Sequence, residues 1–168
     1  ATHAVSEADS PNYNNNSKKE TRMYDSIRPY NIAERRRIQK ASARYETHLE
    51  NILDLLSARG ISEETARYHH LGYIDNDPIP GHEDYNQCIT IPYMYPVWER
   101  PAEIRKMRFR CSLQHDCKTH NHPKYLTPAG DTGSIYNMAA MANPAAEMHI
   151  CEGEFDSMIL EQCGRPAV

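Results

Sequence analysis

The sequence has no long apolar run, no regular cysteine framework and no excess of positive charge. No run approaches the roughly 20 apolar residues of a membrane-spanning helix, and the polar, acidic start is unlike a secretory segment. Five cysteines, an odd number at irregular spacings, argue against a disulfide scaffold and favour a reducing cytosol. The formal net charge of -4 does not by itself indicate a nucleic-acid-binding protein.

The first part of the chain offers almost no large aliphatic residues to bury, and it includes a run of three asparagines. We therefore expect residues 1–24 to be a disordered polar tail. Apolar residues then recur every three or four positions from Ile32 to Arg59, which predicts one long helix. Asn31 and Glu34 form a capping-box pattern at its start. Ser62 is the expected N-cap of a second, short helix.

Two strands are predicted in the central part of the chain. Residues 88–95 are rich in β-forming residues, with Pro92 indicating a strand edge or end. The second strand, residues 106–111, alternates apolar residues with Lys106, Arg108 and Arg110. The two arginines should therefore project from one face of a sheet.

Positive charge is concentrated around this second strand. Residues 99–124 contain seven basic and three acidic residues, a net charge of +4 within a chain of net charge -4. A local positive surface on a sheet face suits a phosphate backbone or a triphosphate. From the residues alone, the alternative is that Arg108 and Arg110 are ordinary surface residues.

Residues 111–122 contain two cysteines and three histidines. Structural zinc sites usually have tighter ligand pairs separated by a longer knuckle, whereas the spacing here is irregular. We therefore expect a polar hairpin loop in this segment and do not expect zinc.

The stretch from residue 148 to the end of the chain has the pattern of a strand, a sharp turn, a helix and the entry to another strand. Gly153 supplies the backbone freedom that a tight strand-to-helix turn needs. Phe155, Met158 and Ile159 recur at helical spacing and give the helix an apolar face. These features predict a β-α-β unit.

Two carboxylates flank this turn. Glu152 directly follows the first strand, which is where open parallel sheets place their chemistry. Asp156 lies one helical turn further, so both side chains can face one site. Such a pair suits a divalent cation, or one metal ligand with a general base. The alternative is a pair of exposed acids that the helix dipole favours near its N-terminus.

Four short motifs, in the same order, resemble bacterial and phage-type DNA primases. Residues 150–156, Ile-Cys-Glu-Gly-Glu-Phe-Asp, resemble the first motif of the TOPRIM domain, in which a Glu precedes a Gly and an Asp follows four residues after the Glu. Residues 122–128, His-Pro-Lys-Tyr-Leu-Thr-Pro, resemble the primase motif Pro-Lys-Tyr-Leu-Asn-Ser-Pro. Residues 134–137 resemble the Leu-Tyr-Gly or Leu-Tyr-Asn that follows it, and residues 56–73 resemble the helical lead-in of the primase core. Motifs in order are more specific than one motif alone.

The resemblance implies an α+β protein. In it, a helical and small-sheet lead-in subdomain is followed by the first β-α-β unit of an α/β TOPRIM domain. After the tail of residues 1–24, we expect the N-terminal subdomain of a primase core over residues 25–140. Residues 141–168 would begin an incomplete TOPRIM domain.

The implied function is DNA primase, as a fragment or as a subunit of a split enzyme. It would contribute to templated RNA primer synthesis on single-stranded DNA in phage or plasmid replication, in the cytoplasm of the bacterial cell. Glu152 would be the catalytic carboxylate and, with Asp156, a ligand of Mg²⁺ (or Mn²⁺). The residues expected to contact nucleic acid or ribonucleoside triphosphates are Arg108, Arg110, Lys124 and Tyr125.

The sequence also departs from the primase pattern. No cysteine precedes Cys88, so we expect the zinc ribbon of the family to be missing, and its Asp-x-Asp metal ligands would lie beyond Val168. We therefore expect the chain to be inactive alone, with a second polypeptide or a missing segment completing the TOPRIM domain. A replicative helicase is a further candidate partner. The alternative function is a non-catalytic module that binds single-stranded nucleic acid or a replication partner.

Overall fold

The computed structural model describes residues 32–97, 100–128, 133–142 and 147–168. The expected tail and the predicted cap residue Asn31 lie outside these ranges. The α-helices are α2 (Ile32–Glu46), α3 (Leu53–Ser57), α4 (Glu63–Tyr68) and α5 (Glu154–Gln162). The 3-10 helices are η1 (Leu49–Ile52), η2 (Glu83–Tyr85) and η3 (Met138–Ala142). The strands are β1 (Gly72–Tyr73), β2 (Cys88–Val97), β3 (Arg100–Cys111) and β4 (Tyr125–Leu126).

The four strands form one antiparallel sheet in the order β1-β2-β3-β4. The long β2–β3 pair is its centre, with Ile89 opposite Arg110 and Ile91 opposite Arg108. Directly opposite residues share a face of the sheet, so the two arginines lie on the same face as the two isoleucines. The combination of helices and a small antiparallel sheet confirms the α+β prediction. Within the described ranges, no helix is both long and apolar enough to cross a membrane.

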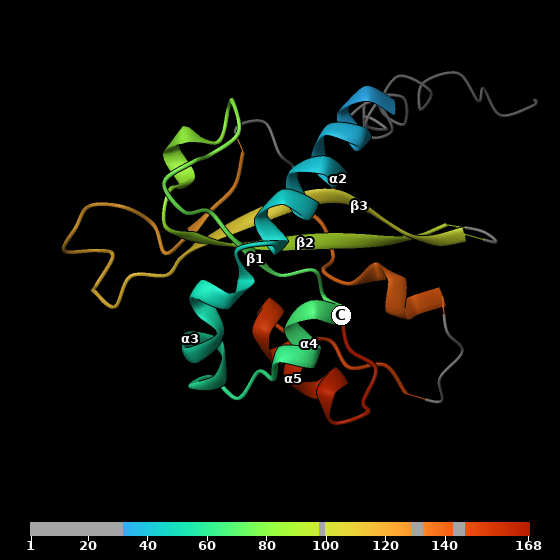
Figure 1. Cartoon of the computed structure of the whole chain (residues 1–168). Helices are drawn as coiled ribbons and strands as arrows, with labels where there is room; N and C mark the ends of the chain where they lie inside the picture. The colour runs from blue at the N-terminus through green and yellow to red at the C-terminus, as the bar shows by residue number, and fades with distance from the viewer. Residues whose placement is uncertain (1–31, 98–99, 129–132, 143–146) are drawn as a thin grey trace, which may run out of the picture.

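Helices cover both faces of the sheet. Figure 1 shows α2 crossing one face of the β2–β3 ribbon, while α3, α4 and α5 gather on the other side. The cluster under α2 consists of Ala41, Tyr45, Ile74, Cys88, Met107 and Phe109. The cluster on the other face contains residues from α3, α4, β2 and α5, among them Leu56, Ala66, Ile89, Ile91, Phe155 and Met158. The core is therefore two hydrophobic layers separated by the sheet.

The single helix predicted over residues 32–59 is wrong, because α2 ends at Glu46 and a turn at residues 47–48 leads into η1 and α3. The apolar stripe explains the break, because its residues before and after the turn pack on opposite faces of the sheet. Ala41 and Tyr45 pack in the cluster under α2. The stripe residues after the turn pack in the opposite cluster; they are Leu49, Ile52 and Leu56. One straight helix cannot present a single stripe to two opposite faces of a sheet.

The C-terminal part forms the predicted β-α-β arrangement. His149 and Ala167 form a parallel bridge, and α5 lies between these two extended segments in sequence. The backbone N–H of Cys151 donates to the carbonyl of Val168 over 2.8 Å, and that of Val168 donates to the carbonyl of His149 over 2.9 Å. The parallel pairing is thus observed, while its assignment to a TOPRIM sheet stays a prediction.

Polar contacts at both ends of α5 attach this unit to the rest of the fold. At the N-terminal end, the carboxylate of Glu154 is 3% exposed and accepts hydrogen bonds from Tyr93 Oη and Arg108 Nη1, over 2.7 and 2.6 Å. At the C-terminal end, Gln162 Oε1 accepts from the backbone N–H of Ser62 and from Thr65 Oγ1, both over 2.8 Å. The helix is therefore fixed to the sheet at one end and to α4 at the other.

The C-terminal end of α2 passes very close to the edge strand β1. A Cβ atom at position 72 would lie 2.4 Å from the carbonyl carbon of Tyr45 and 2.6 Å from the backbone nitrogen of Glu46. These are backbone atoms, which cannot rotate away. We predict that Gly72→Ala lowers the free energy of unfolding by about 2–3 kcal/mol through overpacking.

The matched control is Gly133→Ala, because a Cβ at position 133 would meet nothing within 4 Å. This exposed substitution should change the free energy of unfolding by less than about 0.5 kcal/mol. Urea denaturation followed by circular dichroism measures both variants. Equal stability of the two variants would contradict the close approach at Gly72.

Candidate functional site

The predicted basic face of β3 exists, but helix α5 covers it. Arg108 and Arg110 share one face, as the alternation predicts, while Met107 and Phe109 pack on the other. Arg110 is only 3% exposed. The side chain of Arg108 is 34% exposed and forms an ion pair with buried Glu154. Both guanidinium groups are therefore packed against other parts of the protein and do not form an open basic surface on β3.

Aromatic rings hold these two arginines in place. The guanidinium carbon of Arg108 lies 4.6 Å from the centre of the Tyr125 ring. That of Arg110 lies 5.3 Å from the Tyr125 ring and 4.4 Å from the Phe155 ring. Cations within about 6 Å of a ring centre are attracted by its quadrupole. Tyr125, predicted as a contact residue, thus packs against both predicted arginines.

The pKa shifts differ among the side chains around Arg108 and Arg110. Burial opposes the charge of Arg108, but the hydrogen bond and charge of Glu154 outweigh it and raise the pKa of the guanidinium. Burial lowers the pKa of Arg110. Burial, with the hydrogen bond to Glu154, raises the pKa of the Tyr93 hydroxyl, and burial also raises the pKa of Tyr125. Both phenols therefore stay protonated near neutral pH, and the arginines keep their charge because an ordinary guanidinium pKa is far above 7.

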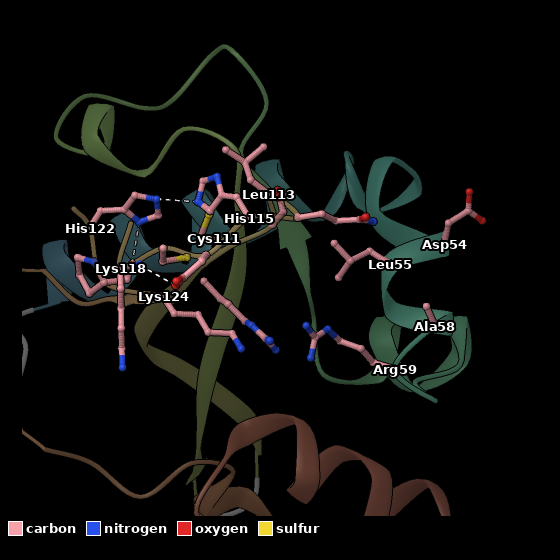
Figure 2. Close-up of a pocket in the computed structure, with 16 residues that line it drawn as sticks. Asp54, Leu55, Ala58, Arg59, Cys111, Leu113, His115, Lys118, His122 and Lys124 are labelled. Carbon is pink, nitrogen blue, oxygen red and sulfur yellow. Dashed lines mark hydrogen bonds between the residues drawn. The ribbon is translucent and has the colours of Figure 1, made fainter. Parts of the chain in front are cut away.

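A cleft of about 1000 Å³ lies between α3 and the loop that connects β3 to β4. Its basic lining residues are Arg59, Arg110, Lys118 and Lys124. Figure 2 shows Arg59 directed into the cleft from the α3 side, with Lys124 on the opposite wall. The carboxylate of Asp54 points away from that wall (Figure 2). The acidic lining residues are Asp54 and Asp116, so the cleft as a whole has more basic than acidic side chains, with accessible cations on two facing walls.

Exposure separates the buried cation of this cleft from the accessible ones. Arg59, Lys118 and Lys124 are exposed, whereas Arg110 is buried. The sequence pattern indicated Lys124 and Arg110 but not Arg59, because Arg59 lies 51 positions before Arg110 and 65 before Lys124. The turn that leads from α3 to α4 brings it to the cleft.

Glu152 and Asp156 are both exposed beside the N-terminus of α5. Glu152 follows the segment that pairs in parallel with the chain end, as predicted. The carboxylate of Asp156 folds back toward the turn, because its Oδ2 lies 3.1 Å from the position of a Cβ on Gly153. Among the described residues, neither carboxylate belongs to a group of three or more metal-ligating side chains.

Such a group does occur in the β3–β4 loop. One ligand atom from each of Cys111, His115, Cys117 and His122 lies within 4.8 Å of the others. Cys111 Sγ is 3.6 Å from His115 Nε2, and His115 Nε2 is 2.8 Å from His122 Nε2. Figure 2 shows His115 and His122 beside Cys111, with nitrogen atoms of the two rings directed at each other. The four side chains can therefore surround one ion.

This group corrects the cofactor prediction. The expectation that zinc is absent is wrong, because two sulfur and two nitrogen donors converge and this donor set points to zinc. The residues that the structure describes show no magnesium or manganese site. The spacing rule failed because the ligands do not come from two separate knuckles. One loop folds back on itself, so irregular sequence intervals become short distances in space.

The fold resembles solved bacterial primases. An Aquifex aeolicus primase structure with zinc-binding and RNA polymerase domains matches with a TM-score of 0.62, over 80% of this chain and 40% of that chain, at 17% identity. The catalytic domain of a DnaG primase bound to single-stranded DNA matches with a TM-score of 0.57, over 88% and 56%, at 13% identity. A DnaG catalytic core matches with a TM-score of 0.55, over 80% and 53%, at 16% identity. The chain thus has a primase-like fold, which confirms the resemblance at the level of fold.

The sequence comparisons are less informative. No family model matches the chain. The Gene 57 protein of Mycobacterium phage D29 is 38% identical over 85 residues, which are 50% of this chain and 51% of that protein. The chain therefore spans about half the length of this relative, and the relative's name states no function.

The buried group around Glu154 gives a stability prediction. Glu154→Ala would leave the guanidinium of Arg108 and the hydroxyl of Tyr93 without their shared acceptor. We predict that it lowers the free energy of unfolding by about 3 kcal/mol, as expected when one partner of a buried ion pair is removed.

Glu152→Ala is the matched control, since it removes the same side chain two residues away at an exposed position. Its effect should stay within about 0.5 kcal/mol. Chemical denaturation of the two variants measures the difference. A cost below about 1 kcal/mol for Glu154→Ala would show that the buried group does not hold α5 to the sheet.

Proposed function

We propose that this chain forms part of a DNA primase and holds single-stranded DNA in the basic cleft. The primase-like fold supports the class of protein, and one of the similar structures is a primase domain bound to single-stranded DNA. The observation that carries the proposal is the exposed cations on two facing walls, Arg59 on one and Lys118 and Lys124 on the other. Such an arrangement follows a phosphate backbone without reading sequence.

In this proposal the basic residues divide into two kinds. Arg59, Lys118 and Lys124 are exposed and contact phosphates directly. Arg110 provides a fixed positive charge at the cleft wall, because Phe155 and Tyr125 hold its guanidinium. Arg108 lies beside Arg110, because the guanidinium groups of both arginines contact the Tyr125 ring.

The proposed reaction is templated ribonucleotide transfer, which makes a short RNA primer. A primer hydroxyl loses its proton and attacks the α-phosphorus of a ribonucleoside triphosphate. A new phosphorus–oxygen bond forms, the bond from the α-phosphorus to the oxygen that bridges it to the β-phosphate breaks, and pyrophosphate leaves. Glu152 is the proposed catalytic carboxylate, since it is exposed at the end of a parallel-paired segment. Asp156 supports it from the first turn of α5. Helix α5 connects the two parts of the site, because Phe155 on the same turn contacts Arg110.

The DNA-binding part of the proposal predicts the effect of a double substitution on two facing walls. Arg59→Ala with Lys124→Ala should weaken binding of a fluorescent single-stranded oligonucleotide. It should also make the negative slope of log affinity against log salt concentration less steep by about 1.4, since each lost single-strand phosphate contact removes about 0.7 from its magnitude. Fluorescence anisotropy at several salt concentrations measures both quantities.

The matched control is Arg36→Ala with Lys40→Ala, which removes the same charges from exposed positions on α2. This helix crosses the opposite face of the sheet (Figure 1). The control should leave the salt slope nearly unchanged. Equal slopes for the two double variants would mean that binding is a general charge effect and that the cleft is not the DNA site.

The catalytic part of the proposal predicts the effect of Glu152→Gln. This change keeps the shape of the side chain and removes its charge, so folding and DNA binding should be preserved. The assay is made with the expected Asp-x-Asp segment supplied, in the same polypeptide or as a second chain. In this assay, Glu152→Gln should abolish primer synthesis. The measurement is ribonucleotide incorporation on a single-stranded DNA template.

Glu147→Gln is the control, because Glu147 is also exposed and precedes the same parallel-paired segment. It should leave primer synthesis intact. Near-normal synthesis by Glu152→Gln would remove the central residue from the mechanism. The non-catalytic binding module would then be the better description.

A further inference from the structure

We propose that Cys111, His115, Cys117 and His122 bind one structural zinc ion that holds the β3–β4 loop in shape. Residues 112–124 form this loop, which contains no helix or strand. The metal-binding part of the inference is independent of the proposed function. Its consequence for the cleft, given below, rests on that function.

The distances fit a tetrahedral ion. Zinc bonds of about 2.3 Å to sulfur and about 2.0–2.1 Å to nitrogen place neighbouring ligand atoms roughly 3.3–3.8 Å apart. The 3.6 Å between Cys111 Sγ and His115 Nε2 agrees with this geometry. The two histidine Nε2 atoms, 2.8 Å apart, need to separate by about 0.5 Å around an ion. All four ligand atoms already lie within 4.8 Å of one another.

The hydrogen bond of the second ring nitrogen selects the tautomer that zinc requires. Nδ1 of His122 lies 3.0 Å from the carbonyl oxygen of Pro123. A proton on Nδ1 makes this hydrogen bond, and the lone pair of Nε2 is then directed at the other three ligands. Histidines that bind metals commonly donate from their other nitrogen in this way. The ring of His115 is supported by His120, which stacks on it at 4.3 Å between ring centres.

The backbone folds so that the ligands meet. A tight turn begins at Asp116, whose Oδ1 accepts from the backbone N–H of Lys118. The N–H of His122 then donates to the carbonyl of Cys117 over 3.0 Å, which brings the last two ligands together. At the base of the loop, the N–H of Cys111 donates to the carbonyl of Lys124, also over 3.0 Å. The first ligand is thereby fixed to the end of the sheet.

The loop has little else to hold it. Leu113, its large aliphatic residue, is 44% exposed, and Cys117 is the buried side chain of residues 112–124. A segment without a hydrophobic core needs another source of stability, and a structural metal is one. Two thiolates and two imidazoles form a donor set that suits zinc, whereas magnesium and calcium prefer oxygen. Two thiolates also neutralise the charge of Zn²⁺.

The consequence concerns the wall of the cleft. Lys118 lies inside the loop and Lys124 follows its last ligand by two positions. An ion at this site would hold both lysines at the cleft. Removing it should leave the rest of the fold in place, because the two hydrophobic clusters include none of the four ligands.

The test is the metal content of the full chain purified without added metal. Inductively coupled plasma mass spectrometry should find about one zinc per chain. Cys117→Ser and His122→Ala should each reduce this content to near zero. The control is Cys163→Ser, which removes an exposed cysteine elsewhere. This control should keep about one zinc.

Cobalt substitution provides a second measurement. Co²⁺ added to the zinc-free chain should give the intense visible bands of a tetrahedral site and thiolate charge-transfer bands. His122→Ala should change these bands, while Cys163→Ser should preserve them. Circular dichroism of each variant shows whether loss of metal reflects loss of the fold.

Two results would overturn the site. One is native protein without stoichiometric zinc and without tetrahedral cobalt bands. The other is zinc content that is equal in the ligand variants and in Cys163→Ser. If zinc binds as described but its removal leaves the affinity for single-stranded DNA unchanged, the metal site stands and its link to the cleft is wrong.

Discussion

The buried carboxylate of Glu154 is the contact on which the arrangement of this protein depends. It joins Tyr93 on β2 and Arg108 on β3 to the first turn of α5. A carboxylate with 3% exposure is costly to bury unless its charge and lone pairs are satisfied. This contact therefore fixes where the first turn of α5 lies against the sheet. Through this contact, the β-α-β unit and the antiparallel sheet become one structure, although they are far apart in sequence.

The same contact determines which charges the protein presents to solvent. The basic face of β3 would carry the most positive surface if it were exposed, but α5 and Tyr125 cover it. Arg110 is held between two aromatic rings, and Arg108 is neutralised by Glu154. At the cleft, the accessible positive charge consequently lies on the turn after α3 and on the β3–β4 loop. A rigid sheet thus supports a binding surface that is formed mainly by loops, which is a common division of labour in proteins.

A loop can provide such a surface only if it keeps its shape. The β3–β4 loop is closed at its base by the sheet and contains almost no buried apolar residue beyond Cys117. Its middle is organised by tight turns and by four convergent donor side chains. This differs from the rest of the fold, in which two hydrophobic clusters on opposite faces of the sheet provide the packing. Two kinds of stabilisation therefore meet at the cleft, apolar packing on one wall and a polar, metal-suited cluster on the other.

The sequence by itself determined the local features, because they depend on neighbours in the chain. Alternation predicted the shared face of Arg108 and Arg110, and helical spacing with Gly153 predicted the β-α-β unit. Only the tertiary structure decided the features that depend on distant residues. A periodic stripe cannot reveal that its two halves pack on opposite faces of the sheet, so the break after Glu46 was missed. Alternation cannot show what covers a strand, and spacing cannot show that Cys111 and His122 meet, because both depend on how the chain folds back.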